Sequence, residues 1–179
     1  MQLQSSYHSP VKRDSTQQVY HVGGSANRKS IFVYDIASNM FETDTTQQLT
    51  RGRRQSGCHI LDSSSGGKLV VAGGLDVHIA DQLYTVEVLD LDGGPAGGAT
   101  IEGPTMPVLE EPYSFVHVDG AFLAIGASAN VIYEYDAAGG NGWKHLSRDY
   151  DYAGGGVNWK NVLAIPADDL LDACEAAAN

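Results

Sequence analysis

The stretch that decides the fold is KLVVAGGLDVHIADQLYTVEVLDL, residues 68–91. An apolar run ends at Gly73 and Gly74, a polar segment follows, and a second apolar run ends at Asp90. Runs of this length, rich in Val, Leu and Tyr and bounded by Gly and Asp, predict two β-strands joined by a loop. One such unit is common in proteins, so its meaning depends on whether it recurs along the chain.

The unit occurs three times. VYHVGG begins at Val19, LVVAGG at Leu69 and FLAIGA at Phe122, at intervals of 50 and 53 residues. A second apolar run follows each of them, and these runs read IFVYDI, VEVLDL and IYEYDA. The three runs place an aspartate at corresponding positions, which are Asp35, Asp90 and Asp136. The chain is therefore predicted to be a repeat protein with a period of about 50 residues.

A further aromatic residue marks two of the units. Phe41 lies seven residues after Tyr34, and Trp143 lies eight residues after Tyr135. The middle unit has the glycine-rich segment DGGPAGGAT in the corresponding place. Each unit is therefore expected to have another strand after the aspartate.

A first strand is predicted ahead of two of the glycine runs, SGCHIL from Ser56 and YSFVHV from Tyr113. The second is joined to its partner through Asp119-Gly120, a dipeptide typical of two-residue hairpins. The unit therefore has four short strands, and the fold class is all-β. LVVA and FLAI are continuously apolar, which predicts strands covered on both faces. Helical periodicity is weak, and only the tail PADDLLDACEAAAN is predicted to form a turn or two.

This pattern of apolar run, glycine pair, variable loop, Tyr-Asp and later aromatic is similar to the kelch repeat of β-propellers. The resemblance covers about Val19 to Pro166. It implies that the glycine pairs let neighbouring blades approach closely and that the aromatics fill the gap between blades. The repeat positions to which it assigns structural roles are Gly23, Gly24, Tyr34, Asp35, Gly73, Gly74, Asp90, Gly126, Tyr135, Asp136 and Trp143. The third unit replaces the pair with Gly126-Ala127 and the second lacks the aromatic, which predicts looser packing at those two interfaces.

The resemblance divides the chain into blades over residues 1–166 and an acidic C-terminal tail over 167–179. The blades are expected at about 3–49, 51–101 and 113–146, with a half-blade at 150–166. Kelch rings usually have six or seven blades, and an open stack exposes apolar faces and strand edges. Three interpretations remain: part of a longer propeller, two chains pairing to make seven blades, or an unusual small or open assembly.

Composition excludes several classes of partner. The chain has 179 residues with 22 acidic and 11 basic side chains, a formal net charge of −11. Such a charge repels phosphate backbones, so neither nucleic acid nor an anionic membrane is an expected partner. No apolar run reaches the 18 residues of a membrane span, and the N-terminal segment lacks the apolar core of a signal peptide.

No arrangement of residues predicts a catalytic, metal or cofactor site. There is no GxSxG, phosphate-binding loop or HExxH, and the six histidines are scattered along the chain. His59 and His117 fall near equivalent places in their units, which invites a metal hypothesis; recurrence of the scaffold explains the spacing more simply. The repeated aspartates are interpreted as hydrogen-bond acceptors in the turns that follow them.

The two cysteines bear on the compartment. Cys58 lies in an apolar strand and is predicted to be a small buried residue. Cys174 lies in the acidic tail, where a disulfide in an oxidising compartment is an alternative to a free thiol. Extracellular kelch proteins that end in such a tail resemble this layout. The localisation is unknown from sequence: extracellular is slightly favoured if the chain is a fragment, and cytoplasmic otherwise.

The resemblance also implies a function. Kelch propellers commonly bind proteins through loops at one end, and the matching positions here are Arg53, Arg54 and Tyr113, residue types enriched at interaction hot spots. Arg53 and Arg54 belong to RGRR, which could equally be a solvated charged loop. The loops SANRKS and LDVHIADQ are further candidates. We therefore expect a non-enzymatic scaffold for protein–protein interaction. The alternatives are a fragment of a kelch-type enzyme, such as a copper-radical oxidase or a sugar epimerase, and a self-associating structural or matrix protein.

Overall fold

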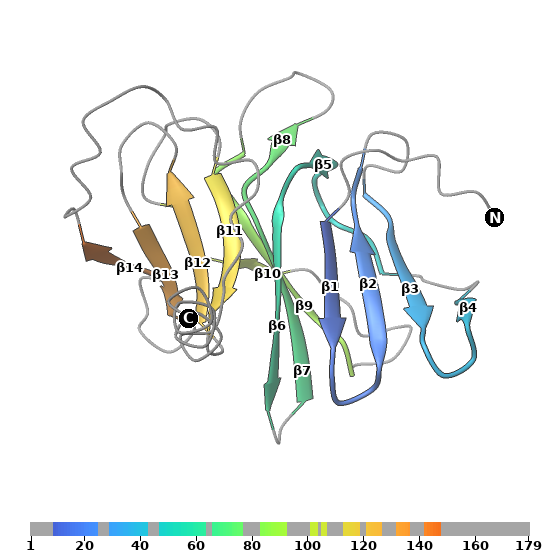
Figure 1. Cartoon of the computed structure of the whole chain (residues 1–179). Helices are drawn as coiled ribbons and strands as arrows, with labels where there is room; N and C mark the ends of the chain where they lie inside the picture. Colours follow the sequence, from blue (N-terminus) through green and yellow to red (C-terminus); the bar gives the residue numbers. More distant parts are fainter. Residues whose placement is uncertain are drawn as a thin grey trace, which may run out of the picture.

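The computed structural model describes residues 9–24, 29–42, 47–63, 66–76, 83–92, 101–103, 105–106, 113–118, 121–126, 132–136 and 142–147. All regular secondary structure in these ranges is β-strand, which confirms the all-β prediction. The strands form three four-stranded antiparallel sheets and one two-stranded ribbon (Figure 1). None of these sheets closes into a barrel or ring.

Sheet 1 is a meander of four strands in sequence order. Its strands are β1 (Ser9–Arg13), β2 (Gln18–Val22), β3 (Ile31–Asp35) and β4 (Met40–Phe41). The sequence did not reveal β1, because SPVKR lacks an apolar run and contains a proline. Pro10 is tolerated because β1 pairs only with β2 and so forms the edge of its sheet.

Sheet 2 lies in the middle of the molecule, with the other two sheets on either side of it (Figure 1). Its strands are β6 (Gly57–Ser63), β7 (Gly66–Ala72), β9 (Val86–Asp90) and β10 (Ile101–Gly103), in the order β6-β7-β9-β10. The ribbon pairs β5 (Arg53–Arg54), just before β6, with β8 (Leu75–Asp76), just after β7. The predicted first strand SGCHIL and the two strands of residues 68–91 are therefore neighbours in one sheet.

Sheet 3 repeats the meander. Its strands are β11 (Tyr113–Val118), β12 (Ala121–Gly126), β13 (Ile132–Asp136) and β14 (Gly142–Ser147). Val118 pairs with Ala121, which leaves two residues between the paired strands and agrees with the predicted hairpin. The two turn residues, the half-blade at 150–166 and the tail lie outside the described residues.

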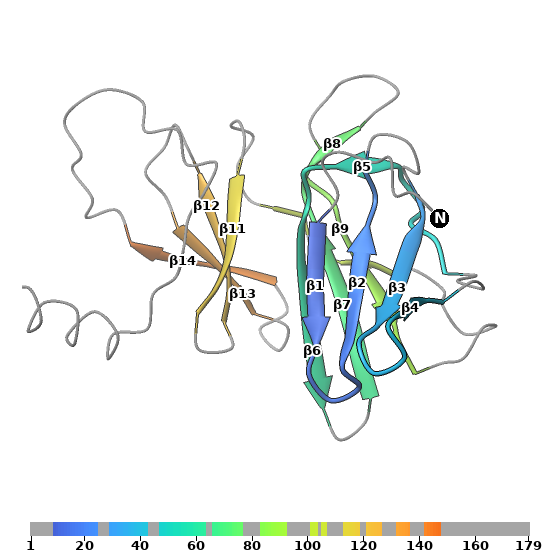
Figure 2. The ribbon, with the colours of Figure 1, turned by 45° about the vertical axis from the view of Figure 1, so that its right-hand side comes forward.

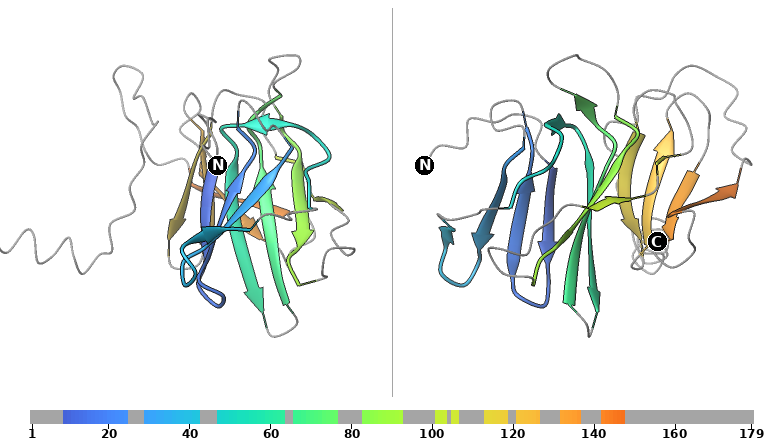
Figure 3. Two further views of the ribbon diagram at one scale, coloured as in Figure 1. Left: turned by 90° about the vertical axis from the view of Figure 1, so that its right-hand side faces the viewer. Right: turned by 180° about the vertical axis from the view of Figure 1, so that it is seen from behind.

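The apolar run of β7 is buried on both faces, as the sequence predicts. Leu69 and Val71 pack in a core shared with sheet 1, whereas Val70 and Ala72 pack in a core shared with sheet 3. All four side chains are 0% exposed. Figure 2 shows sheet 1 lying against one side of sheet 2, and Figure 3 shows the order of the sheets from the side and from behind.

The corresponding run in β12 is covered differently. Phe122 and Ala124 point into the core between sheets 2 and 3 and are buried, whereas Leu123 and Ile125 are only half-buried. The described residues therefore cover β12 fully on one face, because no described sheet packs against the other face.

The junction between sheets 2 and 3 is tightly packed around two glycines. Met106 is 3% exposed, and its Sδ atom and the Phe115 ring lie 3.2 Å from where a Cβ on Gly73 would be. A Cβ on Gly57 would overlap the ring of Phe115 itself. Met106 and Phe115 therefore fill the space beside Gly57 and Gly73 at this junction.

Candidate functional site

One end of the molecule, where β5 and β8 lie, is called the ribbon end. In Figure 1 the first strands β1, β6 and β11 all begin at this end. Because each sheet is an antiparallel meander, β2, β7 and β12 finish there. The segments that follow the glycine runs therefore all leave their sheets at the ribbon end, where loops on a rigid scaffold can present side chains.

The glycine pairs lie at this end and need to be glycine. Gly23 and Gly24 have φ angles of 68° and 106°, and Gly73 and Gly74 have 62° and 96°, which side chains rarely tolerate. A Cβ on Gly74 would also lie 2.6 Å from the carbonyl oxygen of Arg54. The backbone of β5 therefore passes directly over the second pair.

Arg53 connects the two glycine pairs. Its carbonyl accepts a hydrogen bond from the Gly24 N–H at 3.0 Å, and its guanidinium donates to the carbonyl oxygens of Gly73 at 2.9 Å and Thr85 at 3.0 Å. The side chain is 0% exposed. Arg53, which the sequence suggested as a binding residue, therefore has no surface to offer a partner in this structure and serves inside the fold.

Glu87 is the buried counter-charge of Arg53. Its carboxylate is hydrogen-bonded to the guanidinium, and it accepts the backbone N–H groups of Thr50 at 2.7 Å and Arg51 at 3.3 Å. Burial lowers the pKa of Arg53, while the charge of Glu87 opposes that shift. Sequence reasoning missed Glu87, although a charged residue inside the apolar run VEVLDL was a signal that a partner must exist.

Two candidate binding residues remain at the ribbon end. Arg54 lies in β5, where it pairs with Leu75, and its side chain is partly exposed. Tyr113 is the first residue of β11 and pairs with Gly126 at the end of β12. The side chain of Tyr113 lies outside the described set, so only its position in the strand is known.

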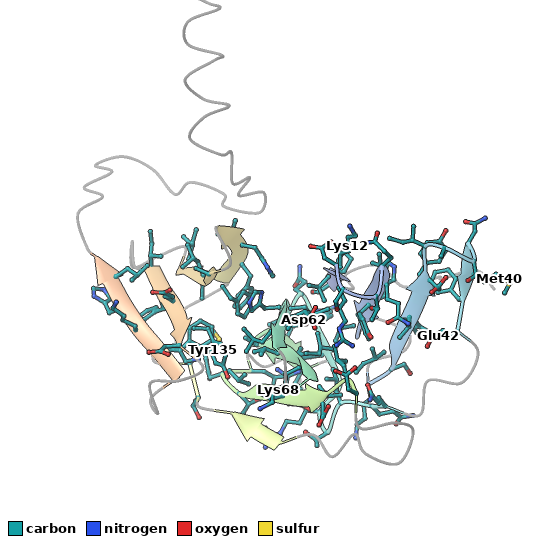
Figure 4. All side chains as sticks on the ribbon, turned by 90° about the horizontal axis from the view of Figure 1, so that it is seen from below. Lys12, Met40, Glu42, Asp62, Lys68 and Tyr135 are labelled. Carbon is teal, nitrogen blue, oxygen red and sulfur yellow. The ribbon has the colours of Figure 1, made fainter. Side chains whose placement is uncertain are left out.

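The opposite end of the junction between sheets 1 and 2 is held by an ion cluster. Arg13, at the end of β1, donates to Asp62 at 2.8 Å and to both carboxylate oxygens of Asp92 at 2.8 Å. Hydrogen bonds from Arg13, and then from the Gly67 N–H, lower the pKa of Asp92 to about 2. Figure 4 shows Asp62 near the middle of the molecule, between the flanking sheets. Sequence reasoning did not single out Arg13.

A histidine pair joins sheets 2 and 3. The Nδ1 atoms of His59 on β6 and His117 on β11 are 2.9 Å apart, and Nε2 of His117 lies 2.7 Å from the carbonyl oxygen of Cys58. His59 is 7% exposed and stacks on Phe122, with ring centroids 5.2 Å apart. Burial, followed by the effect of His117, lowers the pKa of His59 to about 4. The two histidines singled out in the sequence are therefore in direct contact.

The repeated aromatics pair with each other across neighbouring strands. Tyr34 and Phe41 are directly paired across β3 and β4, and Tyr135 and Trp143 are paired across β13 and β14. Their ring centroids are 5.1 Å and 5.3 Å apart. Figure 4 shows Tyr135 on the side of sheet 3 that faces sheet 2. Spacings of seven and eight residues therefore place the aromatics opposite each other across a hairpin.

Two of the repeated aspartates are bound in turns. Asp35 accepts the Ser38 N–H at 2.6 Å, which is the main reason its pKa is lowered, and Asp90 accepts the Asp92 N–H at 3.0 Å. Asp136 ends β13 at the corresponding place. Carboxylates used in this way hold the turns after the strands.

Cys58 is a buried free thiol, as predicted from its apolar strand. It is 5% exposed and packs in the core between sheets 1 and 2. Burial raises its pKa to about 12, so it is an inert thiol at neutral pH. Cys174 lies outside the described residues.

Comparison with models of known protein families finds no match, and comparison with curated proteins finds none either. Among the residues that the structure describes, no group of three or more His, Cys, Asp or Glu side chains could hold a metal ion. Within the same ranges, no helix has the length and apolar character needed to cross a membrane.

Proposed function

We propose that this chain is a kelch-type β-propeller, or a part of one, that serves as a non-enzymatic scaffold and binds a protein partner at the ribbon end. The observation that carries the proposal is the common direction of the three meanders. Their first strands begin at the ribbon end, and the non-repeating segments after the glycine pairs leave from it (Figure 1). A repeated rigid scaffold with its variable segments gathered at one end is typical of a binding module.

Contacts between the sheets support this proposal because they make the end rigid. The Gly24–Arg53–Gly73 hydrogen bonds tie sheet 1 to sheet 2 directly beneath the ribbon. The buried Arg53–Glu87 pair fixes residues 50 and 51, which enter the ribbon. A preorganised surface loses little conformational entropy on binding, which favours affinity for a partner.

The experiment compares two single substitutions, one in the ribbon and one at the opposite end of sheet 2. The immobilised full chain is used to capture a partner, and its affinity is then measured with purified proteins by biolayer interferometry. We expect Arg54→Ala at the ribbon end to weaken binding by about tenfold or more, as at an interaction hot spot. Lys68→Ala, at the exposed start of β7 on the other end, is the control and should change affinity by less than about twofold. Equal losses in the two variants, or no loss in Arg54→Ala, would refute the assignment of the ribbon end.

A second candidate function, self-association, is favoured by the outer edge of sheet 1, which is β4. Phe41 contacts both His21 and Tyr34 there, with ring centroids 5.9 Å and 5.1 Å away, and Met40 is 64% exposed. Figure 4 shows Met40 at the far edge of the sheet, away from the other sheets. Exposed apolar groups on an edge strand favour association with another chain.

Light scattering coupled to gel filtration at several protein concentrations tests this second function. If copies pair through this edge, the mean mass rises with concentration, and Met40→Glu shifts it back towards the monomer. Lys12→Glu is a control that places the same charge on β1. A mass equal to one chain at every concentration would exclude self-association and leave the partner-binding proposal standing.

A further inference from the structure

The histidine pair between sheets 2 and 3 has a geometry that its structural role does not require. His59 and His117 come from strands 58 residues apart in sequence, yet their Nδ1 atoms lie 2.9 Å apart. The ring centroids are only 4.6 Å apart and the rings are inclined at 61°. Two imidazoles whose nitrogens pointed straight at each other would have centroids about 5 Å apart, so the arrangement is bent.

The hydrogen bond to Cys58 decides which nitrogen of His117 is free. A carbonyl oxygen can only accept, so at 2.7 Å the Nε2 atom of His117 must carry the hydrogen. In neutral His117 the Nδ1 atom therefore carries no hydrogen and has an electron pair to donate to a metal ion. This atom faces His59. Metal-binding histidines commonly donate their other N–H to a backbone carbonyl, because this fixes the tautomer and the ring orientation.

His59 is positioned as the second donor. Its ring stacks on Phe122 with an interplanar angle of 14°, which fixes its plane, and only 7% of the residue is exposed. Its Nδ1 becomes an electron-pair donor by moving one hydrogen to Nε2, with no change in charge. His117 is exposed, so water can reach the pair from its side.

We propose that His59 and His117 bind one divalent transition-metal ion, such as Zn²⁺ or Cu²⁺, through their Nδ1 atoms, with water completing the coordination. Imidazole nitrogens suit these ions. Two nitrogens at about 2.0–2.1 Å from a tetrahedral zinc are about 3.3 Å apart, so the pair needs to open by only about 0.4 Å. The exposed side chain of His117 can make this movement. The protein's net charge of −11 raises the local concentration of cations.

An ion at this place would clamp two sheets together. Phe122 and Met106 form an apolar core between sheets 2 and 3, against which Phe115 packs, and the histidine pair adds a polar contact to it. A ligand that bridges β6 and β11 binds only when the two sheets are docked, and so stabilises the folded state by mass action. The inference is independent of what binds at the ribbon end.

Zinc binding to the full chain, without a polyhistidine tag, tests the proposal. Isothermal titration with Zn²⁺ at neutral pH is expected to show one saturable site that is about tenfold or more weaker in His117→Ala. His145→Ala is the matched control, because His145 is also exposed but lies on β14 against Tyr133. Cu²⁺ added to the wild type should give an electron paramagnetic resonance spectrum with two nitrogen ligands, and one nitrogen or none in His117→Ala.

Thermal unfolding keeps the test valid if His117→Ala weakens the fold by itself. Saturating Zn²⁺ should raise the Tm of the wild type and of His145→Ala by several degrees, and leave that of His117→Ala unchanged. The proposal is overturned if no site binds Zn²⁺ more tightly than about 1 mM. It is also overturned if His117→Ala retains the wild-type affinity, since the pair would then be only a hydrogen bond.

Discussion

The buried ion pair Arg53–Glu87 offers the sharpest test of how the ribbon end is built. Both side chains are inaccessible, at 0% and 1% exposure, so solvent does not screen the charge left behind when one partner is neutralised. Glu87→Gln keeps the shape of the side chain but removes the counter-charge, and its single oxygen can accept from only one of Thr50 and Arg51, which bind different oxygens of the carboxylate. Breaking a buried pair from one side costs about 3–5 kcal/mol, and we expect that loss in the free energy of unfolding.

The measurement is urea unfolding followed by far-ultraviolet circular dichroism. With a total stability of about 5–15 kcal/mol for a typical protein, a loss of this size moves the midpoint far towards zero urea. Asp14→Asn is the control, because Asp14 pairs with Lys12 at 2.7 Å but its side chain is 84% exposed. Removing that pair should cost less than about 1 kcal/mol.

A double substitution separates the charge from the packing. Arg53→Met together with Glu87→Leu removes both charges, and leaves the Thr50 and Arg51 N–H groups without an acceptor at a cost of about 1 kcal/mol each or more. We therefore expect the double variant to lose about 2–3 kcal/mol, less than either single variant. The reasoning is refuted if Glu87→Gln costs less than about 1 kcal/mol, or if the effects of Arg53→Met and Glu87→Leu simply add.

Three further predictions follow from other contacts. Gly57→Ala should lower the free energy of unfolding by about 1–3 kcal/mol in urea unfolding, because its Cβ would overlap the Phe115 ring. Gly103→Ala is the control: its Cβ would lie 3.1 Å from Val86, so it should cost clearly less. Equal costs would contradict the packing described for Gly57. The pKa of Asp92 is about 2 in the folded protein, below its ordinary value of 3.8, so its contribution is complete above about pH 4 and is lost as the pH falls towards 2; Asp92→Asn should flatten the dependence of the unfolding free energy on pH in that window, and an unchanged slope would show that Arg13 does not hold this carboxylate. In a Cys174→Ser chain, Cys58 should react with a thiol reagent only as fast as the protein unfolds, because burial raises its pKa to about 12; rapid labelling of the native protein would show that the core between sheets 1 and 2 is open.

Local pattern predicted much of the fold. The unbroken apolar run Leu69–Ala72 indicated a strand covered on both faces, and each of its side chains is fully buried. The spacing from Tyr34 to Phe41 predicted a second strand, and the two rings are direct cross-strand neighbours. β1 was not predicted, because its sequence SPVKR contains charged residues and a proline. It forms a strand because it pairs with β2, not because of its own composition.

The candidate site was harder to predict. Arg53 and Arg54 are adjacent in sequence but differ in burial. The side chain of Arg53 is buried next to the glycine pairs, whereas that of Arg54 is partly exposed. Nothing local distinguishes them, because the alternation of a strand decides which faces the interior only once its sheet is placed. The partner of Arg53, Glu87, lies 34 residues away.

By itself, the sequence determined what depends on neighbours along the chain: an all-β class, a repeat of about 50 residues, the glycine pairs that end the strands, and the strands that must be buried. The tertiary structure decided what depends on contacts between sheets. Arg13 reaches Asp92 across 79 residues, and His59 meets His117 across 58. Such pairs are set by how the sheets pack against one another, and packing is a property of the assembled surfaces rather than of any one strand. In KLVVAGGLDVHIADQLYTVEVLDL, the role of the glycine pair could be predicted from the repeating pattern. The role of Glu87 became evident only in the folded protein, because its partner Arg53 comes from a different part of the chain.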